Sequence, residues 1–156
     1  MDKRTIVTLI VDHLVAELET VAGASREARE AATHEDNRAE DKYDTRATES
    51  SYLADGQARH AAELREAVDI YRTLAVREFS AEEPIALTAL VELKQRTFRD
   101  FYFIGPRNGG VVVQHDGMEI MVITPQSPLG RNLLGRRAGE TIALEGGREA
   151  AILSVR

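Results

Sequence analysis

Two long segments of the chain repeat apolar or small residues at alternating intervals of three and four positions, which is typical of a helix with one packing seam. In residues 3–32 the seam is Val7, Ile10, Leu14, Val21, Ala24, Ala28 and Ala31. From residue 43 onward it is Tyr43, Ala47, Ser50, Ala54, Gln57, Ala61, Leu64, Val68, Tyr71 and Ala75. Residues 33–44 between the two seams are polar. The pattern therefore predicts an antiparallel helical hairpin, a coiled coil folded back on itself, with its tip near 33–44.

Both seams change in size along the hairpin. Alanines and Ser50 lie toward the tip, whereas Ile10, Leu14, Leu64 and Val68 lie toward the base. Small residues bury little apolar area, so we expect the base to be packed firmly and the tip weakly. Some thirty helical residues would make an arm ~45 Å long, at about 1.5 Å per residue.

A different pattern begins after Glu82-Glu83-Pro84, where Pro84 is predicted to end the second helix. Short alternating or β-branched runs follow, separated by glycine-containing turns such as Asn108-Gly109-Gly110 and Asp116-Gly117. The predicted strands are 86–93, 97–104, 111–114, 119–123, 141–144 and 150–155. A short helix is expected between the fourth and fifth, with Ser127 as N-cap, Pro128 in the first turn and Gly135 as C-cap. The fold class is therefore α+β, with a hairpin over 1–80 and an antiparallel β domain over 81–156.

Composition narrows the function classes. The chain has no cysteine, which excludes disulfides, thiolate zinc sites and a thiol nucleophile. The formal net charge is −6, made of −8 over residues 1–84 (11 Lys/Arg against 19 Asp/Glu) and +2 over the rest. This balance argues against specific DNA binding through a broad basic face. The N-terminal segment acquires acidic residues too early for a signal peptide or membrane span, so a cytoplasmic protein without a membrane partner is expected.

One stretch resembles a known family. Residues 123–135 read ITPQSPLGRNLLG and residues 138–142 read AGETI, which resembles the C-terminal signature of the bacterial Gre transcription elongation factors. In that family the signature lies in an FKBP-like β domain that follows an N-terminal helical hairpin. The order of parts and the total length also match, so the resemblance spans essentially the whole chain.

The resemblance implies a binding factor rather than an enzyme. Gre proteins dock their β domain on the rim of the RNA polymerase secondary channel and insert the hairpin. Acidic tip residues then reach the catalytic Mg²⁺ of the polymerase and stimulate cleavage of backtracked RNA. The partner implied is core RNA polymerase, and the implied Mg²⁺ belongs to the polymerase, with no cofactor held by this chain.

The hairpin tip carries the residues that the resemblance points to. Glu40 and Asp41 match the family's acidic tip motif most closely, with Asp36 and Asp44 as supporting carboxylates. The family pattern has an Asp where this chain has Asn37, and it has a glycine that this chain lacks. Two hypotheses follow: the factor stimulates transcript cleavage, or it occupies the channel without cleavage.

The remaining candidates lie in the β domain. Arg131, Arg136 and Arg137, together with Ser127, are the expected polymerase-binding residues, because arginines concentrate there on an otherwise acidic chain. Ser127 is interpreted as a helix cap rather than a nucleophile. The aromatic residues of 98–103 are expected to be mostly core, which argues against prolyl isomerase activity.

The alternative to a polymerase factor is a structural or interaction module whose coiled coil recruits another partner. Both seams are matched within one chain, which favours a monomer. A lone His34 beside Glu35 and Asp36 gives no fixed metal geometry, so no resident metal is expected.

Overall fold

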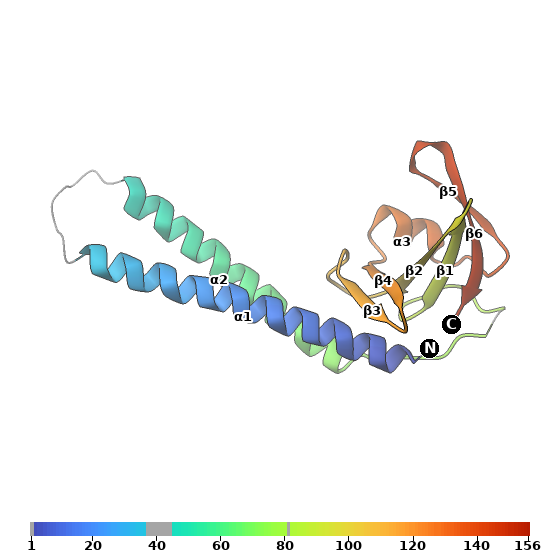
Figure 1. Ribbon diagram of the computed structural model, residues 1–156, viewed down its shortest axis with the longest axis horizontal. Coiled ribbons are helices and arrows are strands. Elements are labelled where there is room, and N and C mark those ends of the chain that lie inside the picture. The colour runs from blue at the N-terminus through green and yellow to red at the C-terminus, as the bar shows by residue number, and fades with distance from the viewer. Residues whose placement is uncertain (1, 37–44, 81) are drawn as a thin grey trace. The chain divides into compact units, whose positions relative to one another are not determined.

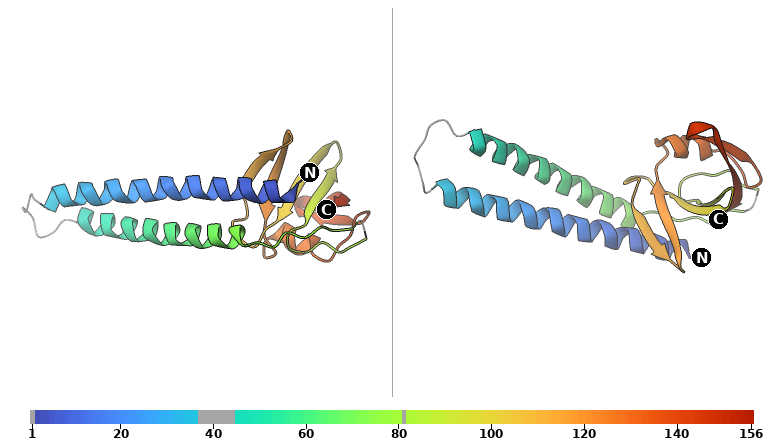
Figure 2. Two further views of the ribbon diagram at one scale, coloured as in Figure 1. Left: turned by 90° about the horizontal axis from the view of Figure 1, so that it is seen from below. Right: turned by 45° about the horizontal axis from the view of Figure 1, so that its top comes forward.

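The computed structural model describes residues 2–36, 45–80 and 82–156. The chain forms two compact units, one comprising Met1–Val11 with Ile70–Arg156 and the other comprising Asp12–Asp69. Helices α1 (Lys3–Asp36) and α2 (Thr45–Arg72) run side by side in opposite directions (Figures 1 and 2). The predicted helical hairpin is confirmed.

The hairpin seam is buried at its base. Asp2 starts α1 by accepting hydrogen bonds from the Arg4 backbone N–H at 2.9 Å and the Thr5 hydroxyl at 3.1 Å. The buried apolar residues of the two helices are Ile6, Val7, Ile10, Leu14, Ala61, Leu64, Ala67, Val68 and Tyr71. Among the side chains described over 15–30 and 52–60, none is buried. The gradient in seam size thus translates into a gradient in burial.

The second helix ends earlier than predicted. Pro84 was expected to stop it, but α2 ends at Arg72. The reason is tertiary: the Nζ of Lys3 donates a hydrogen bond to the carbonyl oxygen of Arg77, and the Arg77 backbone N–H donates to Thr88 Oγ1 at 3.4 Å. These bonds replace the intrahelical ones that a longer helix would require.

All six predicted strands are present, and they form one sheet. The strands are β1 (Leu90–Gln95), β2 (Phe98–Ile104), β3 (Val112–His115), β4 (Met118–Ile123), β5 (Thr141–Leu144) and β6 (Arg148–Val155). The order across the sheet is β3-β4-β2-β1-β6-β5. The short helix α3 (Pro128–Leu133) and a 3₁₀ turn, η1 (Glu145–Gly147), complete the elements.

The expectation of an antiparallel sheet was wrong in one pairing. Strands β2 and β4 are parallel, with Phe101 opposite Ile120, so the sheet is mixed. The cause is the strand order: β3 lies outside β4 as the edge strand, and the β3–β4 hairpin brings β4 back beside β2 in the same direction. The other pairings are antiparallel.

Two of the predicted turns differ in role. Asp116 and Gly117 have φ of 52° and 74° and close the β3–β4 hairpin between His115 and Met118, as a type I′ turn requires. The turn at Asn108 does not close a hairpin, as had been expected, because β2 and β3 are not paired.

The sheet is buried on both faces. On the α3 side the core contains Val91, Leu93, Ile104, Ile123, Leu133, Ile142 and Ile152. The alternate positions Leu90, Phe103, Ile120 and Val122 are also buried and point to the opposite face. Burial on this second face explains why residues 120–123 of β4 form a continuous apolar run.

Candidate functional site: a groove beside α3

The short helix α3 is built by a serine cap. Ser127 has extended backbone angles, and its Oγ accepts a hydrogen bond from the Gly130 N–H at 3.0 Å. The same hydroxyl donates to the carbonyl oxygen of Thr124 at 2.8 Å. Pro128 occupies the first turn, as predicted. The C-cap is Leu134, one residue earlier than the predicted Gly135, which follows it with a φ of 80°.

Close packing holds α3 against the turn before it. A Cβ atom at Gly130 would overlap the carbonyl oxygen of Thr124. Asn132 Nδ2 donates to the Ala143 carbonyl oxygen at 3.1 Å, which ties the helix to β5. The position of α3 on the sheet is therefore fixed from both sides.

A groove of about 330 Å³ runs between α3 and the sheet, and we call it the α3 groove. The helix side contributes Ser127, Pro128, Leu129 and Asn132, and the sheet side contributes Tyr102, Met121, Ile123 and Leu144. Gln95, Glu145 and Arg148 lie at its end. Apolar walls with a few polar groups at the margin are typical of binding clefts.

The groove residues remain open to solvent to different degrees. Met121 is 38% exposed. Tyr102 is half-buried, and burial is the main cause that raises the pKa of its hydroxyl, which therefore stays neutral. Neither Tyr102 nor Met121 was singled out as a site residue from the sequence. Met121 alternates with its buried neighbours Ile120 and Val122 along β4, whereas no such alternation marks Tyr102 in β2.

The three predicted polymerase-binding arginines are exposed but do not line the groove. Arg131 donates from Nη1 to the Gln126 carbonyl oxygen at 2.6 Å. Arg136 pairs with Glu140 at 3.1 Å, and Arg137 donates from Nε to the Glu82 carbonyl oxygen at 2.9 Å. Of the four predicted docking residues, only Ser127 lies in the groove.

The side chain of Glu140 connects two of these arginines. Its pKa is held below the ordinary value first by the side-chain hydrogen bond from Arg136 and further by the Arg137 backbone N–H, which donates to Glu140 Oε1 at 2.9 Å. The segment after α3 is thus held by hydrogen bonds to a carboxylate that is ionised at neutral pH.

The acidic tip is described only in part. Asp36 is the last residue of α1, and Glu40, Asp41 and Asp44 lie outside the described residues. Their roles stay predictions. Within the described residues there is no group of three or more His, Asp or Glu side chains that could hold a metal ion.

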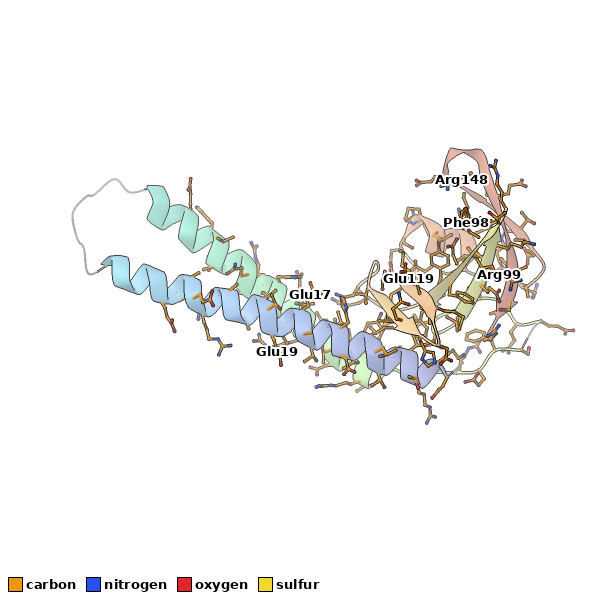
Figure 3. All side chains as sticks on the ribbon, in the orientation of Figure 1. Glu17, Glu19, Phe98, Arg99, Glu119 and Arg148 are labelled. Carbon is orange, nitrogen blue, oxygen red and sulfur yellow. The ribbon has the colours of Figure 1, made fainter. Side chains whose placement is uncertain are left out.

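Two side chains of the hairpin form a contact across the helices. Glu17 interrupts the α1 seam, and its Oε1 lies 3.2 Å from His60 Nε2 on α2. Figure 3 shows Glu17 on α1, facing the neighbouring helix. A polar pair at this position adds directional contact where apolar packing is thin.

The aromatic residues of β2 are less buried than expected. Phe103 is buried, and Phe101 and Tyr102 are half-buried, whereas Phe98 is 72% exposed. Phe98 is the first residue of β2 and lies beyond the edge of the core.

In the described part of the chain, neither long helix has an 18-residue stretch apolar enough to span a membrane. No family model matches the sequence, and no curated protein matches it. Three similar solved structures are those of the transcription factor Gfh1, the GreA factor homolog 1 (Gfh1) protein of Thermus thermophilus, and Thermus aquaticus Gfh1.

These three are each 22% identical to this chain, with TM-scores of 0.39, 0.39 and 0.38. The alignments cover 94%, 94% and 93% of this chain and 92%, 94% and 92% of the respective matched chains. Values this low do not assign the chain to a family.

Proposed function

We propose that this chain is a transcription regulator that binds bacterial RNA polymerase. In this proposal the β domain docks through the α3 groove, and the hairpin enters the secondary channel. The observation that carries it is the position of the segment that resembles the Gre signature. Its members Ile123, Ser127, Pro128, Leu129 and Asn132 all line the α3 groove.

The chemistry of the groove supports a protein partner. Met121 and Leu129 offer apolar surface, and methionine adapts to irregular partner surfaces because its side chain is flexible and polarisable. Asn132 and Gln95 supply polar groups at the margin, which is the usual division between an apolar interface centre and a polar rim. The exposed Arg131 on the same helix would then contribute rim contacts.

The length of the hairpin and its acidic tip residues support channel insertion. Helix α1 has 34 residues, which corresponds to ~50 Å at about 1.5 Å per residue. Carboxylates are the ligands that Mg²⁺ prefers. We infer that Glu40 and Asp41, with Asp36 or Asp44 supporting, approach the Mg²⁺ of the polymerase.

A pull-down with core RNA polymerase tests the docking surface. Met121→Glu places a charge in the groove, so we expect it to reduce retention of polymerase at least tenfold. Leu153→Glu is the matched control, because Leu153 is also 38% exposed but does not line the groove. Equal retention of both variants would exclude the α3 groove as the docking surface, and failure of the wild type to bind would exclude the function.

A backtracked elongation complex tests the tip. If the tip stimulates cleavage, the Glu40→Ala plus Asp41→Ala double variant should lose stimulation while keeping polymerase binding. Equal cleavage by wild type and double variant would remove both residues from the mechanism. Binding without stimulation by either protein would identify a channel-occupying regulator that does not stimulate cleavage.

A second candidate function is that of a protein-interaction module acting through the hairpin. It is favoured by Tyr52 and Leu53, which are 73% and 61% exposed on α2. They border a hollow shared with Val21 and Ala24 of α1. Sedimentation velocity distinguishes the two: a concentration-dependent dimer that Leu53→Glu abolishes would support this candidate, whereas a monomer would leave polymerase docking as the proposal.

A further inference from the structure

Several cations lie near an exposed aromatic ring at the end of the β1–β2 hairpin. Lys94, Arg96 and Arg99 lie within six positions of the chain and flank Phe98. Arg148 begins β6 beside them. Figure 3 shows Phe98 and Arg148 at the same end of the sheet. We call this group the hairpin-end cluster.

A hollow of about 670 Å³ lies within the cluster. Its lining residues are Gln95, Arg96, Phe98, Gly146, Gly147, Arg148 and Glu149. Two cations therefore face one acidic residue, and the ring of Phe98 supplies the apolar surface. A phenyl ring with this exposure is not stabilised by packing in the core of the protein. Any favourable contact that it makes must therefore lie outside the core.

Of the four cations in the cluster, only Arg99 has an ion pair within the described residues. Lys94 and Arg96 form no ion pair there, and Arg148 donates only to the Glu145 carbonyl oxygen, at 3.3 Å. Lys94 lies directly opposite Arg99 in the β1–β2 register, and like charges in this position destabilise a strand pair. Arg99 is compensated on its other side by Glu92, at 2.8 Å.

The turn itself is strained. Arg96 has a φ of 47°, in the left-handed region that non-glycine residues seldom adopt. A two-residue hairpin turn usually places Gly or Asn at such a position. An arginine that keeps this conformation, with its side chain unpaired, holds a free cation at the outermost point of the hairpin.

We propose that the hairpin-end cluster binds single-stranded nucleic acid, with a base stacked on Phe98 and phosphates held by Arg96 and Arg148. Aromatic platforms beside cations are the usual means of binding single strands without sequence preference. Lys94 and Arg99 lie on the opposite face of the hairpin and extend the phosphate track around its end. A duplex does not fit this chemistry, since its bases are already stacked. The proposal does not depend on polymerase binding.

Fluorescence anisotropy with the full chain and end-labelled, mixed-sequence RNA and DNA oligonucleotides tests the proposal. The wild type should bind at low salt, and Phe98→Leu, which keeps an apolar side chain but removes the π-face, should bind about tenfold more weakly. Phe98→Trp should bind at least as well as the wild type. Arg96→Ala should reduce the salt-dependence slope by ~0.7 for one lost phosphate contact.

The controls separate charge and folding from recognition. Arg65→Ala removes the same charge from exposed α2 and should leave binding unchanged, and thermal melting should show each variant folded. RNA binding that exceeds DNA binding, or the reverse, would identify the natural strand. The proposal is overturned if the wild type does not bind, if Phe98→Leu binds as the wild type does, or if an acidic peptide competes as well as the oligonucleotides.

Discussion

The hydroxyl of Tyr71 donates a hydrogen bond of 2.7 Å to the carbonyl oxygen of Arg107. The same hydroxyl lies against Gly105, where a Cβ atom would overlap the Tyr71 oxygen and lie 2.7 Å from Val122 Cγ1. The φ of Gly105 is not positive, so the glycine is required for space and not for backbone conformation. Burial raises the pKa of Tyr71, which keeps the hydroxyl a donor.

The first prediction follows from this close approach. Gly105→Ala should lower the free energy of unfolding by about 1–3 kcal/mol, because the added methyl group overpacks a filled site. Adding Tyr71→Phe should recover part of the loss, since it removes the overlapping oxygen. Urea denaturation of the two single variants and the double variant measures the coupling, and strictly additive losses would contradict the account.

The second prediction concerns α3. Gly130→Ala should cost about 1–3 kcal/mol, because its methyl group would push the Thr124 carbonyl away from the helix. Ser127→Ala should cost ~1 kcal/mol through loss of the cap. Both losses can be measured by thermal denaturation. If Gly130→Ala melted at the wild-type temperature, the packing of α3 on the preceding turn would be looser than described.

The third prediction concerns a substitution that should stabilise the protein. Gly23 and Gly56 lie in the interiors of α1 and α2, and a Cβ atom at either would meet nothing within 4 Å. Glycine in a helix interior costs ~1 kcal/mol relative to alanine, so Gly56→Ala should stabilise the hairpin. Amide hydrogen exchange should slow over residues 52–60 in this variant. Unchanged or faster exchange would contradict the prediction.

The fourth prediction concerns acid pH. The pKa of Glu140 is lower in the folded protein than its ordinary value of 4.5, first because of the Arg136 side chain. A carboxylate of this kind contributes stability above its unfolded pKa, and that contribution is lost as the pH falls through the folded pKa. Urea midpoints between pH ~6 and pH ~3 should therefore fall less steeply in Glu140→Gln than in the wild type.

Arg136→Gln removes the partner of the carboxylate instead of the carboxylate itself. The urea midpoint of this variant should likewise fall less steeply with decreasing pH than that of the wild type. If the two variants retained the full pH dependence of the wild type, the Arg136–Glu140 contact would not stabilise the folded protein.

Local patterns predicted the elements well. The three-and-four spacing placed both helices, and β5 was predicted with its observed bounds, because these features depend on neighbouring residues. The end of α2 at Arg72 was not predictable in this way. It depends on Lys3, which lies 74 positions from its partner Arg77. Alternation likewise shows where strands lie but not that β2 and β4 pair in parallel.

The candidate site was predictable in part. The Ser127-Pro128 pair predicted a capped helix, and the cap is present. The α3 groove was not foreseen, because Tyr102, Met121 and Leu144 come from three separate strands that only the folded sheet brings together. Phe98 was expected to share the core with its neighbours, but strand ends lie outside the periodic burial that holds at the strand centre.

The unit that contains the sheet is discontinuous in sequence, since Met1–Val11 belongs to it together with Ile70–Arg156. In topological terms the rest of the hairpin is an insertion between residues 11 and 70. During synthesis the first turn of α1 emerges early, but its partner Arg77 is made only after the second helix. An insertion of this kind can also change length without disturbing the unit that carries it. Removing seven residues from each helix would keep the seams in phase and shorten the hairpin by ~10 Å.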